Sequence, residues 1–217
     1  EGDAIINQLG MTIHYNTEVG KSIDFEKIVQ NSDAVLLAVG ASKATPMGIE
    51  GEDLPGVFSG IDLLEKMAKY EPVDIGKRVV VAGGGSTAMD AARASVRLGA
   101  KATVVYRRTK NEMPAHHAEV LDAYDEEVDI KVLTNPVKIE KTKQGLKITC
   151  IKMELSEPDE SGRRRPIAID GSEFEIEADS IIMAIGQKTD FSFIKNKGVN
   201  KWGLFDTKGK TYQTVAD

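Results

Sequence analysis

Three consecutive glycines, Gly83-Gly84-Gly85, separate an apolar run from a helical pattern, and this junction restricts the fold more than any other feature of the sequence. The preceding residues, 78–82, read RVVVA, which is typical of a strand buried on both faces. The following residues predict a helix over 87–98 that ends at Gly99, and then a strand over 102–106. The order of strand, glycine turn, helix and strand predicts a βαβ unit of a parallel sheet.

The glycine turn and the residues after it, Gly83-Gly84-Gly85-Ser86-Thr87-Ala88, fit the form G-x-G-x-x-A of a dinucleotide-binding fingerprint. The first glycine permits the tight turn, and Gly85 lets backbone N–H groups approach a pyrophosphate at the positive end of the helix. Small residues that would let the helix lie close on the sheet recur at helical spacing, at Ala88, Ala92, Ser95 and Gly99. A plain glycine turn is the alternative, but the flanking strand and helix favour nucleotide binding.

Two arginines, Arg107 and Arg108, follow the strand predicted over 102–106. An NAD-selective site places Asp or Glu about twenty residues after the motif to hold the ribose 2′-hydroxyl, whereas an arginine there suits the 2′-phosphate of NADP. Here the strand ends without a carboxylate. The pair therefore favours NADP(H) over NAD(H), and the alternative is two solvated arginines on a loop.

The composition excludes several classes of protein. The formal net charge of -6 argues against a nucleic-acid binder, because such domains usually carry a basic face. With Cys150 as the only cysteine, an internal disulfide or a Cys-x-x-Cys site is excluded and a reducing cytoplasm is expected. The longest apolar run, 34–41, is too short to span a membrane. We expect His116 and His117 to be solvated rather than metal ligands, and we predict no metal site.

A faint internal repeat suggests pieces of two similar domains. Residues 33–40 read DAVLLAVG and residues 179–186 read DSIIMAIG, so the aspartate, the apolar run, the alanine and the last glycine coincide. Each run is predicted to form a fully buried strand of a parallel sheet that ends at a glycine turn.

Further elements complete the predicted fold. The pattern predicts helices over 60–70 and 114–127, a strand over 128–133, and a β-meander over 137–178 with strands over 147–155 and 173–177. The predicted fold class is α/β: a Rossmann-like NADP-binding domain with a central parallel sheet and a β-meander.

Three runs together resemble the small (beta) subunit family of NADPH-dependent glutamate synthase. They are GGGSTAMD at 83–90, YRR at 106–108 with MPA at 113–115, and AIGQ at 184–187. The resemblance covers nearly the whole chain and implies an FAD-binding domain that is interrupted by an NADP-binding domain. Such an arrangement accounts for the two matching strand ends.

The resemblance also implies domain boundaries. Residues 1–50 would be the C-terminal part of a split FAD-binding domain, 51–187 the NAD(P)-binding domain, and 188–217 a return segment toward the FAD domain. The fold would therefore be flanked by remnants of an FAD-binding domain. Because the family's FAD fingerprint would precede residue 1, we expect the chain alone to be inactive.

The resemblance finally implies roles for single residues. Ala184, Ile185 and Gly186 would border the nicotinamide half of NADPH, and Val19 with Ala38, Val39 and Gly40 would face FAD in the full-length protein. NADPH would pass a hydride to FAD, and electrons would continue to iron–sulfur centres or to a partner. That partner would be the glutamate synthase large subunit or another electron-accepting subunit or domain. No residue of this chain is predicted to be catalytic.

Two other functions remain open at this point. One is a non-catalytic nucleotide-binding module, and the other is an NAD-dependent dehydrogenase. A short dehydrogenase would carry a Tyr-x-x-x-Lys pair. Tyr15, Tyr70 and Tyr124 have no lysine four residues on, whereas Tyr106 is followed at that spacing by Lys110.

Overall fold

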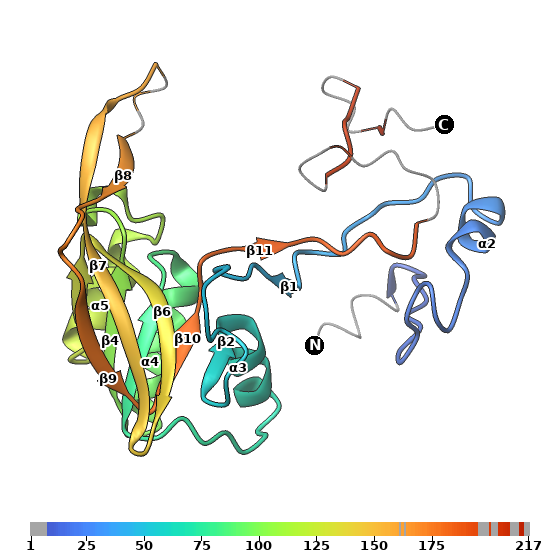
Figure 1. Ribbon diagram of the computed structural model, residues 1–217. Coiled ribbons are helices and arrows are strands. Elements are labelled where there is room, and N and C mark those ends of the chain that lie inside the picture. Colours follow the sequence, from blue (N-terminus) through green and yellow to red (C-terminus); the bar gives the residue numbers. More distant parts are fainter. Residues whose placement is uncertain are drawn as a thin grey trace. The chain divides into compact units, whose positions relative to one another are not determined.

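The computed structural model describes residues 8–160, 162, 164–194, 200, 204–208 and 213–214 of the 217-residue chain. The chain divides into two compact units, Ser42–Lys188 and a second unit made of Glu1–Ala41 and Thr189–Asp217 (Figure 1). The boundary predicted between residues 50 and 51 lies inside the first unit. No helix in the described part of the chain is long and apolar enough to cross a membrane.

A parallel sheet of five strands forms the centre of the 42–188 unit, in the order β2-β10-β3-β4-β5. The strands are β2 (Val57–Ser59), β3 (Arg78–Ala82), β4 (Lys101–Tyr106), β5 (Asp129–Val132) and β10 (Ser180–Met183). Three helices connect them: α3 (Gly60–Ala68), α4 (Ser86–Arg97) and α5 (His117–Asp125). This arrangement confirms the predicted α/β class.

The sheet has a different cover on each face, and the alternation of its residues explains why. Val79, Val81 and Val104 pack with helix residues such as Leu63 and Met89 in one core cluster. Their neighbours along the strands, Val80, Ala82 and Val105, belong to a second cluster with residues of the β-meander. Because successive side chains of a strand point to opposite faces, apolar residues at every position bury both faces at once.

The meander consists of β6 (Thr134–Thr142), the long strand β7 (Gly145–Pro158), β8 (Arg164–Ala168) and β9 (Phe174–Ala178). Strand β7 pairs with β6 and β9 along its first part and with β8 along its second part, always antiparallel. Two short strands, β1 (Lys43–Ala44) and β11 (Gln187–Lys188), form an antiparallel pair. The meander is confirmed, although β1, β2, β8 and β11 were not predicted.

Helix α5 begins three residues later than predicted. His116 is extended and acts as the N-cap, and the N–H of Ala115 donates to the carbonyl of Gly84 at 3.1 Å. The segment before the helix is therefore bonded to the glycine turn rather than to its own helix. Helix α4 lies close on the sheet as expected, with Ala88, Ala92 and Ser95 fully buried.

The prediction of a buried strand over 33–40 is wrong. This segment has no strand geometry, and Val35, Leu36 and Val39 are exposed, Leu36 to 90%. A strand needs neighbouring strands for its backbone hydrogen bonds, and no described segment pairs with this one.

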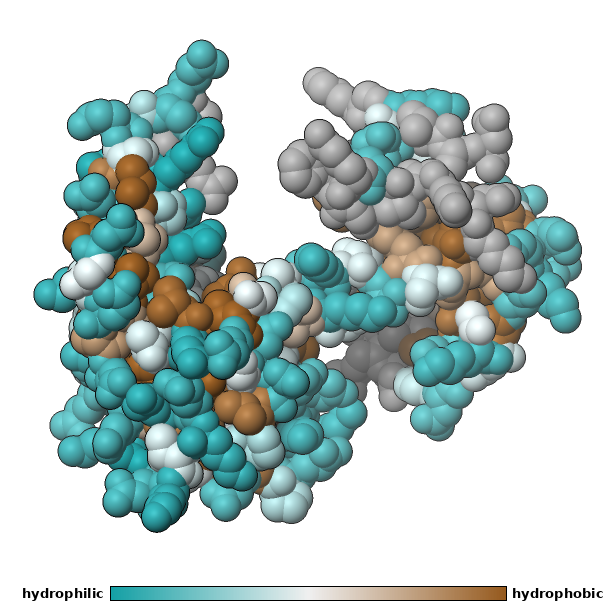
Figure 2. Space-filling model, viewed as in Figure 1, coloured by the Kyte–Doolittle hydropathy of each residue, from teal (hydrophilic) through white to brown (hydrophobic). Residues whose placement is uncertain are grey.

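The second unit has little buried surface in its described residues. It contains α2 (Phe25–Gln30), and its aromatic rings meet edge to face, Phe25 with Phe193 and Phe191 with Phe205. Figure 2 shows apolar residues at the surface of this unit, and the exposed set includes Leu9, Met11, Ile13 and Tyr15. Among the residues that the structure describes, all those of the buried core lie in the 42–188 unit.

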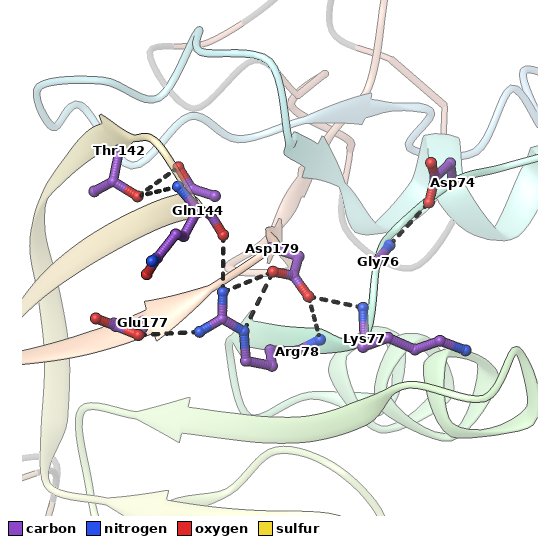
Figure 3. A network of polar contacts seen from close by, with 9 residues as sticks. Asp74, Gly76, Lys77, Arg78, Thr142, Gln144, Glu177 and Asp179 are labelled. Carbon is purple, nitrogen blue, oxygen red and sulfur yellow. Dashed lines mark hydrogen bonds and ion pairs between the residues drawn. The ribbon is translucent and has the colours of Figure 1, made fainter.

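A network of charged groups joins the start of β3 to the meander (Figure 3). The carboxylate of Asp179, between β9 and β10, accepts from the backbone N–H groups of Lys77 and Arg78 at 2.8 Å. The Arg78 guanidinium donates to Asp179, to Glu177 and to the carbonyl of Gln144. These bonds to Arg78 and to backbone N–H groups lower the pKa of Asp179 from 3.8 to about 2.

We expect Asp179→Asn to destabilise the chain at neutral pH by about 1–2 kcal/mol, because the partly exposed ion pair is screened by water. A carboxyl whose folded pKa is lowered contributes stability above its unfolded pKa and loses it as the pH falls toward the folded value. The difference between wild type and variant should therefore shrink between pH 4 and 2. Urea unfolding across this range measures it, and a difference independent of pH would contradict the network's role.

Candidate functional site: a cavity at the strand ends

A cavity of about 780 Å³ opens in the 42–188 unit at the carboxyl ends of β10, β3 and β4. Its walls include the glycine turn 83–85, the strand end 105–108, the start of β6 at 134–136 and the segment 183–187. The carboxyl ends of strands in an open parallel sheet are where such folds bind ligands. The sequence predicted the glycines, the arginines and 184–186 as site residues, and the structure brings all three groups to this cavity.

Gly83 turns the chain away from β3 at a place where no side chain fits. Its φ is +148°, and a Cβ there would lie 2.2 Å from the carbonyl oxygen of Ala184. The Gly83 N–H donates to the carbonyl of Val105 at 3.1 Å, and the Ala184 N–H donates to that of Ala82 at 2.8 Å. The turn is thus held between the ends of β4 and β10.

The other two glycines have different surroundings. A Cβ on Gly84 would lie 2.5 Å from the ring of Tyr106, so this glycine leaves room for the ring. A Cβ on Gly85 would meet nothing within 4 Å, and Gly85 has an ordinary φ of -95°. The packing of the chain therefore does not require glycine at residue 85, and the open space beside it belongs to the cavity.

Gly85 is also the N-cap of α4, and no side chain caps this helix through a hydrogen bond. The first N–H groups of the helix lie at its positive end and are suited to an anion. Thr87 lines the cavity, whereas Ala88 is fully buried under the helix. Ser86 points elsewhere: its hydroxyl bonds to Glu119, and this bond lowers the pKa of the Glu119 carboxyl.

Two cationic side chains enter the cavity at the end of β4. Arg107 is exposed and Arg108 is half-buried, and both line the wall. Within the described residues neither forms an ion pair with a carboxylate, and the Nε of Arg108 is buried without a hydrogen-bond partner. Buried donors are nearly always satisfied. Arg107 and Arg108 thus bring positive charge to the cavity wall that no described carboxylate neutralises.

The opposite wall is formed by Ala184, Ile185 and Gly186. Ile185 is 44% exposed, and Gly186 has a φ of +145°. The carbonyl of Gly186 accepts from the N–H of Thr45 at 3.0 Å. Next to it the side-chain amide of Gln187 donates to the hydroxyl of Thr87 at 2.9 Å, so this wall is bonded to the first turn of α4.

Several lining residues were not predicted. Tyr106, Asn135 and Gln187 bring polar atoms to the wall, together with Thr45 and Thr134. Tyr106 and Gln187 lie within the runs YRR and AIGQ that carry the family resemblance, whereas only the position beside a strand end could have indicated the others. Within the described chain the lining contains no carboxylate, histidine, cysteine or lysine. The cavity can therefore bind and orient an anionic ligand through its arginines and backbone N–H groups.

Four predicted residues do not belong to this cavity. Val19, Ala38, Val39 and Gly40 lie in the other unit, where Val19 forms an isolated bridge with Ile23. Val19 is half-buried and the other three are exposed. Their predicted contact with FAD stays a prediction.

Two further features of the sequence have no reactive role. Cys150 is fully buried, and burial raises the pKa of its thiol to about 12. Tyr106 and Lys110 have the spacing of a dehydrogenase pair, but the Tyr106 hydroxyl donates to the carbonyl of Glu112 at 2.6 Å. The Lys110 ammonium lies 4.6 Å from the centre of the Tyr124 ring. No group of three or more metal-binding side chains occurs in the described ranges.

Comparison with known proteins gives a consistent result. Residues 5–215 match the family described as pyridine nucleotide-disulphide oxidoreductase. The chain is 45% identical over 214 residues to the NADPH-Fe(3+) oxidoreductase subunit beta of Geobacter sulfurreducens, covering 94% of this chain and 32% of that protein. It is 41% identical to the glutamate synthase [NADPH] small chain of Escherichia coli, covering 84% of this chain and 42% of that one. The chain thus spans less than half the length of these relatives.

The fold has relatives among solved structures as well. FprA of Mycobacterium tuberculosis, solved in complex with NADPH, aligns with a TM-score of 0.72 at 19% identity, over 89% of this chain and 58% of that one. At this identity the likeness concerns the fold alone.

The different surroundings of the glycines predict different effects of substitution. Gly84→Ala should destabilise the chain by roughly 1–3 kcal/mol, because the new methyl group overlaps the Tyr106 ring. Gly85→Val should cost less than about 1 kcal/mol, because its side chain enters open space at an ordinary φ. Thermal unfolding of both variants tests this. A Gly85→Val variant as unstable as Gly84→Ala would show that there is no open space beside residue 85.

Proposed function

The chain belongs to the pyridine nucleotide-disulphide oxidoreductase family, and we propose that its 42–188 unit is the NADP(H)-binding domain of an FAD-dependent oxidoreductase similar to the glutamate synthase small chain. One observation carries the proposal. Arg107 and Arg108, which form no ion pair with a carboxylate in the part of the chain that the structure describes, line the same cavity as the glycine turn. A cavity with two anion-binding places at its ends fits a dinucleotide that carries a diphosphate and a further phosphate.

The residues present fit the two phosphate groups of NADP(H). The diphosphate would lie against the start of α4, where Gly85 leaves open space and the first N–H groups have no capping side chain. The 2′-phosphate would lie against Arg107 and Arg108. Each charge-assisted hydrogen bond contributes roughly 1.5–3 kcal/mol, so two arginines would favour NADP(H) over NAD(H) by about a hundredfold or more.

The wall formed by Ala184, Ile185 and Gly186 would border the nicotinamide half. Gly186 has no side chain and Ala184 a small one, which leaves room for a flat ring, and Ile185 is partly exposed. When bound, these cofactors supply hydride transfer from NADPH to FAD, after which electrons pass to iron–sulfur centres or to a partner subunit. The side chains of the cavity orient the nucleotide and do not exchange protons with it.

The second unit would contribute to the FAD site of the full-length protein. Ala38, Val39 and Gly40, together with Val19, would face FAD there. Their support is the exposed apolar character of 33–40, which is unusual for a soluble surface and fits a segment covered by another part of the protein. An electron-accepting subunit, such as the large subunit of glutamate synthase, is the corresponding partner, and the cytoplasm is the expected location.

The two alternative functions make different demands on the chain. A short dehydrogenase needs a free tyrosine hydroxyl beside its lysine. Here the hydroxyl of Tyr106 donates a hydrogen bond to the carbonyl of Glu112, and the ammonium of Lys110 lies over the ring of Tyr124. A non-catalytic module would bind the nucleotide in this cavity without oxidising it. The full-length protein distinguishes this case, because a module binds NADPH but does not reduce FAD.

The chain should bind NADPH more tightly than NADH, by about a hundredfold or more, because only NADPH has a 2′-phosphate that the two arginines can bind. Arg107→Ala combined with Arg108→Ala should remove most of this preference and leave NADH binding nearly unchanged. Titration calorimetry with both nucleotides measures the effect. Equal affinities of the wild-type chain for the two nucleotides would refute the proposed specificity.

Gly85→Val should weaken NADPH binding by at least about a hundredfold, because a branched side chain displaces the diphosphate from several backbone N–H groups. The fold should stay intact, since nothing of the chain lies within 4 Å of the new Cβ. Calorimetry and thermal unfolding of the same preparation separate the two effects. Normal melting with normal NADPH binding would place the nucleotide elsewhere.

A further inference from the structure

The segment 106–115 connects β4 to α5 and contains both arginines. We call this segment the bracket, because both of its ends are held at the same glycine. It leaves the sheet at Tyr106, whose ring lies against Gly84, and it returns at Ala115, whose N–H donates to the Gly84 carbonyl at 3.1 Å. Both ends of the segment 106–115 are therefore fixed to the middle glycine of the turn. Arg107 and Arg108 lie inside this bracket.

Glu112 closes the bracket with three hydrogen bonds. Its carboxylate accepts from the backbone N–H of Thr109 at 3.1 Å and from the Thr109 hydroxyl. Its carbonyl accepts from the hydroxyl of Tyr106 at 2.6 Å. Thr109 and Glu112 form a capping box around the short 3₁₀ turn η1 (Lys110–Glu112). Tyr106 is 7% exposed, so it links this turn to Gly84 from inside the unit.

The negative charge of Glu112 is stabilised by hydrogen bonds within the turn. The hydrogen bond from Thr109 is the main reason that the pKa of Glu112 is lowered, and the positive charge that adds to this effect is Arg164. Neither Arg107 nor Arg108 forms an ion pair with Glu112 within the described chain. The carboxylate therefore fixes the backbone beside the arginines and leaves their charge for a ligand.

We propose that Glu112 is a positioning residue that holds Arg107 and Arg108 at a fixed place relative to the glycine turn and so determines the preference for a 2′-phosphorylated dinucleotide. This inference rests on the proposed function of the cavity. Glu112 does not line the cavity. It acts by ordering the bracket before binding, so that the entropy of fixing the loop is not lost when the phosphate binds.

The experiment compares Glu112→Ala with Glu112→Gln and Tyr106→Phe in the 217-residue chain, with NADPH and NADH as probes in calorimetry. Glutamine can form the same capping box, and phenylalanine keeps the ring on Gly84 but removes the bond to Glu112. Thr142→Ala is the matched control, because it removes a hydroxyl that accepts a hydrogen bond from the N–H of Gln144 in a turn and lies outside the cavity.

We expect Glu112→Ala to weaken NADPH binding about tenfold while NADH binding changes less than about twofold. Tyr106→Phe should have a smaller effect in the same direction, and Glu112→Gln should keep the wild-type preference. Thr142→Ala should change the melting temperature but neither affinity. In a chain that already carries Arg107→Ala and Arg108→Ala, Glu112→Ala should have no further effect on the ratio of the two affinities.

Four results would overturn the inference. Equal loss for both nucleotides in Glu112→Ala would mean general damage to the site, and loss of preference in Glu112→Gln would mean that charge rather than the capping box matters. If Glu112→Ala does not fold, an unchanged preference in Tyr106→Phe is the contradicting result. A wild-type chain that binds neither nucleotide refutes the proposed function itself, whereas a wild-type preference unaffected by these variants refutes this inference alone.

Discussion

The close approach of Gly83 to the carbonyl of Ala184 is the constraint on which the site depends. A Cβ at residue 83 would lie 2.2 Å from that oxygen, so β3 and β10 can end side by side only with glycine there. The N–H of Gly83 reaches the end of β4 at the carbonyl of Val105. This one turn therefore sets the relative positions of α4, of the arginines after β4, and of the wall at 184–186.

The shape of the cavity depends mainly on the course of the backbone at the glycine turn and at the strand ends. Backbone amides, three glycines and small residues form the wall at the start of α4, and the side chains of Arg107 and Arg108, without an ion pair in the described chain, form the wall after β4. The buried faces of the sheet keep these groups in place, with helices on one side and the meander on the other. Arg78 and Asp179 fix the opposite end of the strands to the meander (Figure 3). A site of this kind is suited to bind and orient an anionic ligand.

The sequence was most informative where local rules and tertiary structure agree. The glycine turn, helix α4 and strands β3, β4 and β10 were predicted because apolar runs and glycines have few other interpretations. The segment 33–40 has the same pattern as 179–186 but forms no strand, because strand formation depends on neighbours that a pattern does not reveal. The short strands β2 and β8 escaped prediction for a related reason, since pairing rather than composition defines them.

The site shows the same limit at the level of side chains. Arg107 and Arg108 could be identified from their distance to the motif, whereas the contact between Tyr106 and Gly84 could not. The most direct test of the account is a crystal structure of the chain with NADP⁺. The account predicts the diphosphate at the first turn of α4 and the 2′-phosphate within hydrogen-bond distance of both arginines. A nucleotide bound outside this cavity, or a 2′-phosphate in solvent away from Arg107 and Arg108, would contradict it.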